Sequence, residues 1–593
     1  MEREAANSTY KWNLEELYPN QEAWDKEYNE LLNGVEKFGE YKGKFNDKKE
    51  LAKYYRYDEE FSRKFMNLYL YAFLGHDVNL KENRYQNNLI KMSSLSTKLG
   101  QITAYISPEM ASLDDGYLNE LMNDERFKDY KLKFESIILN KKHILSEKEE
   151  KALATTSSFV DGFSDIYDTL IDTDLTYDSF VVDGKEYPMS EEKYSKYMDN
   201  DNREVRRKAY ESLYAQYKKF ARTFAKLYTY HVKMCGSDLK LRNYDSYLSA
   251  TLEGSKIPNG VYYKLIDKVN ENVDMIKEYF SLVKKQLKIE DFSFYDTYTT
   301  ISELNKEYDQ ETQFEIVKKA LYVLGEEYQQ LLQTAHDNNW MDIYPSDTKA
   351  SGGYQFGSYD THPYVLLNNT DNYNSMSTMA HELGHAMHSY YSNKNQPYPT
   401  HNYAIYVAEV ASTVNEILLN RYMIEHSVDN EEKIFFIDKY IKNIKATVFR
   451  QTMFSEFEEK IHNMIEDDIP VGIDEINQVY KELLEKHFGG VVNIDDNINH
   501  EWIRISHFYR PFYVYKYATS YTCANYIASC ILEDKNNMRE KYFELLKSGG
   551  SDWPNNILKN VGVDLQSDAP YDMLFNDLKK HIELLKTLLE QRR

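Results

Sequence analysis

Two histidines four residues apart, His381 and His385, lie in a segment, Met376 to Tyr391, whose sequence predicts one continuous helix. Four residues along a helix rise about 6 Å and turn by roughly 40°, so both imidazoles project from the same face. Neutral imidazoles placed in this way suit two neighbouring vertices of a tetrahedral Zn²⁺. The segment is otherwise mainly apolar, so two histidines and Glu382 need a partner there that offsets their desolvation. A metal ion would supply it.

The residues from His381 to His385 form the pattern His-Glu-x-x-His, which is typical of zinc hydrolases. In this pattern the glutamate, here Glu382, lies close enough to a water on the metal to take its proton without being a ligand. The alternative is a helix whose histidines are ordinary surface or core residues, and the pattern arises by chance in roughly a few per cent of chains of this size. We therefore expect one Zn²⁺ per chain, with Glu382 as the general base.

The residues after His385 exclude one way of completing the site. The metzincin extension of the pattern requires glycine at position 388 and histidine at position 391, but the chain has His388 and Tyr391 there. His388 lies about 10 Å from His381 along the helix axis, which is too far for both to bind one tetrahedral ion. We expect His388 to pack against the site or to support it.

A carboxylate on a following helix is the best candidate for the third ligand. Ala404 to Leu419 has the pattern of a second apolar helix, and Glu409 lies inside it, twenty-four residues after His385. His401 and Glu416 are weaker candidates for the same role.

Two stretches, His381 to Tyr391 and Ala408 to Thr413, resemble the oligoendopeptidase F branch of the thimet oligopeptidase family of zinc metallopeptidases. The stretch Tyr10 to Pro19 is similar to the opening of such chains. The resemblance covers most of the chain and is strongest from 345 to 420 and from 500 to 526. It implies a zinc metalloendopeptidase that hydrolyses peptide bonds in short unfolded oligopeptides. The metal ligands that it implies are His381, His385 and Glu409.

In that mechanism Glu382 takes a proton from a water activated by the metal and later passes it to the departing amine.

Two other classes of protein remain open. One is a metal-free helical scaffold or peptide-binding protein, which would not need the complete ligand set. The other is a zinc carboxypeptidase on a similar fold, for which Arg504 or Arg510 could bind the substrate's terminal carboxylate.

A second unusual stretch, Ser506 to Ala518, is rich in tyrosine. Its tyrosines recur every four residues from position 509 to position 521, which predicts that part of the stretch stacks hydroxyls along one helical face. Such stripes are more often core packing than chemistry. The family resemblance instead implies a histidine followed by tyrosines that hold the substrate carbonyl. The predicted catalytic residues are His507, Tyr513 and Tyr517, and the predicted substrate contacts are Tyr509 and Tyr515.

The residues before the His381 helix predict a strand. Ser351 to Gly357 is a glycine-rich loop without the lysine of a phosphate-binding loop, so nucleotide binding is a poor interpretation. Pro363 to Asn369 has the pattern of a short strand that ends in turn residues. Such a strand is expected to be the edge on which a peptide substrate adds, although a purely structural strand is the alternative. The predicted substrate contacts here are Tyr364, Val365, Leu366 and Leu367.

The rest of the chain has a helical pattern with one interruption. Only 22 glycines and 12 prolines occur among 593 residues, which favours long helices with few turns. Asp183-Gly184, between two short apolar runs, predicts a hairpin within Phe180 to Pro188. Ser190 is expected to cap one long helix that continues to about Met234.

These patterns predict a mostly α fold: a large two-lobed helical fold that encloses a deep substrate channel, with a small β-sheet next to the His381 helix. The expected domains are an N-terminal helical lobe, residues 1–200, with a short hairpin near 180–188, and a catalytic zinc-peptidase lobe, residues 201–593.

Charge and composition limit the partners. A net charge of −24 argues against nucleic acid and anionic membranes. The chain has no uninterrupted run of about 18 apolar residues, so we expect no membrane-spanning helix. Three cysteines are an odd number in a large chain, which fits a reducing compartment, and the N-terminus has no apolar signal segment. We expect a cytoplasmic protein whose partners are oligopeptide substrates and whose activity does not require an oligomer.

Overall fold

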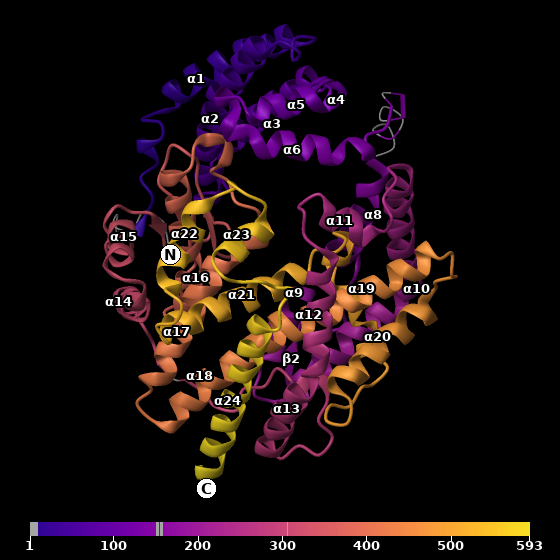
Figure 1. The fold of residues 1–593 in the computed structure, drawn as a ribbon. Coiled ribbons are helices and arrows are strands. Elements are labelled where there is room, and N and C mark those ends of the chain that lie inside the picture. The colour runs from indigo at the N-terminus through magenta and orange to yellow at the C-terminus, as the bar shows by residue number, and fades with distance from the viewer. Residues whose placement is uncertain (1–9, 147, 150–152, 154–157, 305, 593) are drawn as a thin grey trace. The chain divides into compact units, whose positions relative to one another are not determined.

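The computed structural model describes residues 10–146, 148–149, 153, 158–304 and 306–592, which form mostly α-helices and two small sheets (Figure 1). The predicted mostly α class is therefore confirmed. The chain divides into two compact units, each assembled from three chain segments. The first unit takes Met1–Lys141, Lys306–Tyr422 and Ile527–Val563. The second takes Lys142–Asn305, Met423–Tyr526 and Asp564–Arg593.

The predicted domains differ from these units, because a division at residue 200 is sequential whereas each unit draws on the beginning, middle and end of the chain. The division at residue 200 and the substrate channel stay predictions. None of the helices in the described ranges combines the length and the apolar content that crossing a membrane requires.

The first unit contains the predicted metal-binding segments. Its helices are α1 (Gln21–Gly34), α2 (Lys48–Val78), α3 (Asn83–Thr103), α4 (Ile106–Ser112), α5 (Asp115–Met122), α6 (Lys131–Asn140), α14 (Gln310–Ala320), α15 (Glu326–Asp337), α16 (Tyr373–Asn395), α22 (Met538–Ser548), α23 (Pro554–Asn560) and the part of α17 (Ile405–Glu425) that ends at Tyr422. Helix α16 packs against α14, α15 and α22. The predicted helices around His381 and Glu409 correspond to α16 and α17.

A three-stranded sheet of the first unit lies against α16, as the sequence predicts. Its strands are β3 (Met341–Asp342), β4 (Tyr354–Phe356) and β5 (Tyr364–Leu366), in the order β3-β5-β4. β5 is parallel to β3 and antiparallel to β4. The strand nearest to α16 in sequence is therefore the central strand, with a partner on each side.

The segment around Trp12 covers the outer side of β3. The Ile343 N–H donates to the Tyr10 carbonyl oxygen at 3.2 Å, and the Trp12 indole N–H donates to the Trp340 carbonyl oxygen at 2.9 Å. Trp12 also packs edge-on against Tyr364 in a buried cluster. Among the described strands of this sheet, the remaining outer edge is that of β4.

The second unit is also helical. Its elements are α8 (Ser158–Thr169), β1 (Phe180–Val182), β2 (Lys185–Tyr187), α9 (Glu191–Met198), α10 (Arg203–Leu241), α11 (Tyr247–Glu253), α12 (Asn259–Glu271), α13 (Val273–Leu287), α18 (Asn430–Ile444), α19 (Arg450–Glu466), α20 (Ile473–Phe488), α24 (Ala569–Gln591) and the part of α21 (Tyr515–Leu532) that ends at Tyr526.

The predicted hairpin is confirmed, but the helix after it is divided in two. β1 and β2 pair antiparallel across Asp183 and Gly184, whose φ angles are 52° and 77°. Ser190 caps only the short helix α9. The side chain of Asn202 then accepts from the Glu204 N–H at 2.9 Å and begins α10. The single long helix predicted after Ser190 is wrong, because the Asn202 cap satisfies a backbone donor at a new helix start.

Candidate metal centre

Helices α16 and α17 approach each other so closely that only glycine fits at their crossing. A Cβ atom on Gly384 would lie 2.6 Å from Ser412 Cα and 2.7 Å from the Ala411 carbonyl oxygen. Asn415 joins the two helices, because its side-chain N–H donates to the Ala380 carbonyl oxygen at 3.0 Å. The glycine of the His-Glu-x-x-His pattern therefore lets the carboxylates of α17 reach the histidines of α16.

We expect Gly384→Ala to lower both the melting temperature and the affinity for metal. The added methyl group meets backbone atoms, so the helices must separate, at a cost of roughly 1–3 kcal/mol. Gly236→Ala in α10 is the control, since nothing lies within 4 Å of its added Cβ and alanine is the better helix former. Thermal unfolding and metal analysis check both variants. Wild-type values for Gly384→Ala would contradict the role of this contact.

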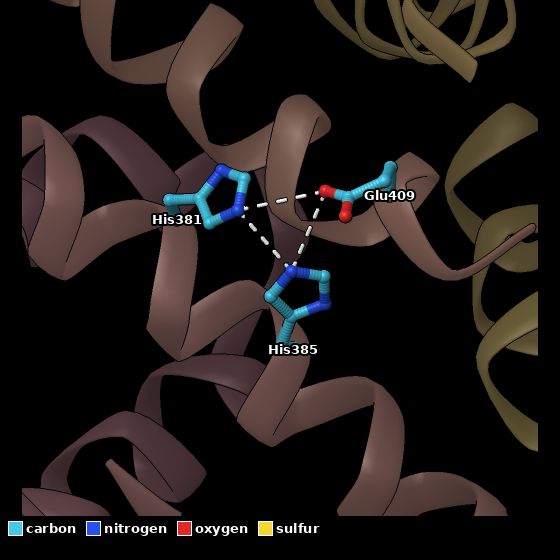
Figure 2. Close-up of side chains that lie close together, drawn as sticks. All are labelled: His381, His385 and Glu409. Atoms are coloured by element: carbon cyan, nitrogen blue, oxygen red, sulfur yellow. Dashed lines mark hydrogen bonds and ion pairs between the residues drawn. The ribbon is translucent and has the colours of Figure 1, made fainter. Parts of the chain in front are cut away.

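His381, His385 and Glu409 turn their side chains toward one point, the histidines from α16 and the glutamate from α17 (Figure 2). The two histidine Nε2 atoms are 3.2 Å apart, and each lies 3.5 Å from Glu409 Oε2. Ligand atoms about 2.0–2.1 Å from a tetrahedral zinc ion lie ~3.3 Å from one another. The three atoms therefore have the spacing of three ligands to one metal ion.

Glu416, a weaker sequence-based candidate for a ligand, lies behind His381 instead. Its carboxylate pairs with His381 Nδ1, while His381 Nε2 faces Glu409. A carboxylate at the second nitrogen of a metal-binding histidine fixes the ring orientation and leaves Nε2 to bind the metal. Glu416 is therefore suited to orient His381 rather than to bind the ion.

The carboxylates around His381 and His385 stabilise positive charge at this site. Burial disfavours protonation of His381, but the hydrogen bond and charge of Glu416, with smaller effects of Glu382 and Glu409, raise its pKa to about 9. Burial also opposes ionisation of Glu409, yet His385 and His381 lower the pKa of Glu409 to about 2. Both shifts arise from the attraction between positive charge and this group of carboxylates, which also stabilises a bound cation.

Glu382 lies beside the donors and is buried, with 7% of its surface exposed. Burial raises its pKa, although both neighbouring histidines act in the opposite direction. Gly353, in the loop before β4, passes close by: a Cβ at that position would lie 3.6 Å from Glu382 Oε1. The sequence argues against nucleotide binding at this loop but predicts no role for it. Its glycines are a signal of a close backbone approach.

The two other histidines of the region are engaged in different contacts. His388 is fully buried and stacks on Tyr403 with ring centroids 3.6 Å apart, in agreement with the expected packing role. His401 Nδ1 lies 2.6 Å from the Tyr398 carbonyl oxygen, and His401 is not among the clustered metal donors of the described chain.

The second unit brings together the predicted catalytic residues His507, Tyr513 and Tyr517. Tyr517 Oη lies 3.4 Å from His507 Nε2, and the Tyr513 and Tyr517 ring centroids are 5.5 Å apart. Tyr513 also stacks on His507, with ring centroids 6.0 Å apart. Burial and then the charge of Arg510 lower the pKa of His507, which favours the neutral imidazole. These side chains form one cluster of hydrogen-bonding groups.

Only Tyr517 and Tyr521 of the predicted tyrosine stripe share a helix, because α21 begins at Tyr515. Phe512, just before it, has φ 52°, which breaks the helical path. Tyr509 is buried against Tyr167 and His231. Tyr515 is buried against Tyr262. The predicted substrate contacts of Tyr509 and Tyr515 are therefore not supported, since both rings lie in the aromatic core of the second unit.

The predicted pairing of substrate with Tyr364–Leu367 is not supported either. The Val365 and Leu367 N–H groups donate to the Trp340 and Asp342 carbonyl oxygens at 2.7 and 2.8 Å, and the opposite side of β5 pairs with β4. All four side chains are buried, with Tyr364 and Leu366 in the cluster around Trp12. A strand that has partners on both sides has no edge to offer a peptide.

The comparisons with known proteins agree with the motifs. A family model described as Peptidase family M3 matches residues 196–577, and one described as Oligopeptidase F matches residues 109–177. The chain belongs to peptidase family M3. This M3 peptidase is 34% identical over 582 residues to the oligopeptidase PepF of Bacillus subtilis, which covers 98% of this chain and 87% of that protein.

Solved structures share the fold of this M3 peptidase over nearly its whole length. A Chlamydophila abortus protein of known crystal structure matches with a TM-score of 0.93 at 32% identity and covers 99% of each chain. The oligoendopeptidase-F from Enterococcus faecium matches with a TM-score of 0.75 at 28% identity, over 96% of this chain and 99% of that one. The resemblance to oligoendopeptidase F is thus confirmed, and the chain is a peptidase of a metallopeptidase family that hydrolyses oligopeptides.

Proposed function

We propose that this M3 peptidase is a zinc-dependent endopeptidase that hydrolyses peptide bonds in short unfolded oligopeptides. One Zn²⁺ per chain would be held by His381, His385 and Glu409. The spacing of their three donor atoms, 3.2 to 3.5 Å, carries the proposal, and two imidazoles with one carboxylate are a known donor set of catalytic zinc sites. When bound, zinc would polarise the scissile carbonyl and lower the pKa of a water toward 7.

Glu382 is the proposed general base. It is not one of the three clustered donors, so its carboxylate remains available to accept the proton of the attacking water. Burial raises its pKa, which favours holding that proton until the departing amine takes it. The backbone at Gly353 lies beside this carboxylate, since a Cβ there would be 3.6 Å from Glu382 Oε1.

His507, Tyr513 and Tyr517 are proposed to donate hydrogen bonds to the oxyanion that develops on the substrate carbonyl. A hydroxyl and a neutral imidazole can both donate without bringing a full charge, and such donors act mainly in the transition state. The contact between Tyr517 and His507 supports a shared role, because it holds the two groups in one cluster.

We expect Tyr513→Phe or Tyr517→Phe to lower kcat by about 10²–10³-fold with a smaller change in KM. Tyr515→Phe is the matched control, since its hydroxyl is buried and has no hydrogen-bond partner among the described residues. Steady-state kinetics and melting temperatures of the three variants separate chemistry from packing. Normal kcat in both test variants would remove these tyrosines from the mechanism and leave the oxyanion to zinc and His507.

The edge of β4 is the proposed binding line for the peptide main chain. Because Val365 directs its backbone groups toward β3, its neighbours Tyr364 and Leu366 face β4 and pair there with Phe356 and Tyr354. The N–H and C=O of Gln355, between those two, point outward. An extended peptide could add there as one more strand.

The remaining expectations follow from composition. The net charge of −24 supports oligopeptide partners rather than nucleic acid or membrane surfaces. No disulfide joins Cys235, Cys523 and Cys530, all of which the structure describes, and this supports a cytoplasmic location. Activity is proposed not to require an oligomer.

A doubly blocked, internally quenched peptide tests the function. The zinc-loaded protein should cleave it, and a chelator should stop cleavage until zinc is returned. A carboxypeptidase would leave it intact and would cleave only the version with an unblocked C-terminus.

Two arginines are candidates for binding the terminal carboxylate of a carboxypeptidase substrate. Arg504 forms an ion pair with Glu191 at 2.7 Å, whereas Arg510 is exposed.

A further inference from the structure

A small cavity lies beside the metal-binding helix in the first unit. Its volume is about 230 Å³, less than the roughly 300–1,000 Å³ of a site for a whole small-molecule ligand, so it has room for a single side chain. The residues that line it include Gln355, Pro363, Ser389, Asn393, His401 and Tyr403. We call it the Ser389 pocket.

The pocket lies beside α16, which carries His385 and Glu382, and beside β4, whose preceding residue Gly353 lies close to Glu382. Ser389 follows His385 by four residues on α16, which is about 6 Å along the same face. Gln355 follows Gly353, the neighbour of Glu382, by two residues along the edge strand, which is ~7 Å. Ser389 and Gln355 meet, since the Ser389 hydroxyl donates to Gln355 Oε1 at 3.0 Å. A peptide paired with β4 beside Glu382 would therefore pass the mouth of this pocket.

Hydrogen-bonding groups without formal charge dominate the pocket wall. The Asn393 side-chain N–H donates to the Ser358 carbonyl oxygen at 2.9 Å, which leaves its Oδ1 as an acceptor. Because Gln355 Oε1 accepts from Ser389, the Gln355 amide N–H groups remain as donors. His401 uses Nδ1 toward the Tyr398 carbonyl oxygen, which makes Nε2 an acceptor. No Asp, Glu, Lys or Arg lines the pocket among the described residues.

We propose that the Ser389 pocket is a specificity subsite for one substrate side chain that is uncharged and forms hydrogen bonds: glutamine, asparagine or tyrosine. A charged side chain would lose its hydration there without an opposite charge to replace it. An aliphatic side chain would leave the Gln355 amide N–H groups and Asn393 Oδ1 without partners. This inference rests on the proposed endopeptidase function and adds the feature that selects the cleavage site.

Digestion of a library of doubly blocked peptides, read by mass spectrometry, tests the subsite. One position at a fixed distance from the cut should be enriched in glutamine, asparagine and tyrosine and depleted in charged residues. Gln355→Glu keeps the acceptor for Ser389 but adds a negative charge. It should shift that one position toward lysine and arginine by about 10-fold in relative kcat/KM, which corresponds to ~1.4 kcal/mol, with the other positions unchanged.

Asn393→Asp adds the same charge from the helix side and covers the case in which Gln355→Glu is unstable. Asn395→Asp on α16 is the matched control, since Asn395 lies outside the pocket. Its specificity should equal that of the wild type. A folded, active Gln355→Glu or Asn393→Asp variant with unchanged preference would overturn the subsite. If the zinc-loaded wild type cleaves no blocked peptide, the proposed function itself fails.

Discussion

Replacing Glu382 with glutamine is expected to lower kcat by about 10²–10⁴-fold while the protein keeps one zinc ion per chain. Glutamine has nearly the same shape, but its amide cannot take a proton from the attacking water. Zinc should remain because the three clustered donors do not include Glu382. The side chain is buried, so the isosteric change keeps the packing. Metal analysis and kinetics on a blocked peptide measure the two effects separately.

Glu425→Gln is the matched control for this variant, because Glu425 is an exposed glutamate at the end of α17. It should have wild-type activity and zinc content. Two results would contradict the assignment of Glu382. Wild-type turnover in zinc-replete Glu382→Gln would exclude it as the base, and loss of zinc from that variant would make it a ligand.

The second large effect is expected at Glu409. Glu409→Ala removes one of the three proposed ligands, so zinc affinity should fall by more than about 100-fold and activity should disappear at limiting zinc. Glu416→Ala removes only the partner of His381 Nδ1, and the loss of such an orienting carboxylate typically lowers metal affinity by about 10–100-fold. Zinc titration against a competing chelator gives both affinities.

Excess zinc distinguishes the two roles further. The Glu416→Ala protein should regain most of its activity, since its three proposed ligands are intact, whereas Glu409→Ala should recover little. Glu425→Ala, on the same helix, should match the wild type. If the Glu416 variant alone were stripped of zinc by dialysis, the third ligand would be Glu416 and the sequence-based preference for Glu409 would be wrong.

The sequence was sufficient for the parts of the site that depend on local geometry. His381 and His385 share a face of α16 because helical spacing is fixed over four residues, and Asp183-Gly184 forms its turn because both residues tolerate positive φ. Glu409 could be selected because a carboxylate in an apolar helix needs a partner. Its distance from the histidines depends on Gly384, whose role is visible only once α17 lies against α16.

Features that depend on pairing between distant segments could not be predicted in this way. The place of β5 just before α16 predicts an edge strand, but β4 on one side and β3, covered by the segment around Trp12, on the other make it central. Tyr515 lies only two residues from Tyr517, but it is buried and its ring packs against the distant Tyr262. In each case the deciding contact comes from residues far away in the chain.

The most direct test of the account is anomalous diffraction at the zinc absorption edge from crystals of the purified protein. We predict one anomalous peak per chain, bound by His381 Nε2, His385 Nε2 and the Glu409 carboxylate, with Glu416 on His381 Nδ1 and Glu382 outside the ligand set. A zinc-replete crystal with no peak between these three residues, or with its peak on other side chains, would contradict the central claim.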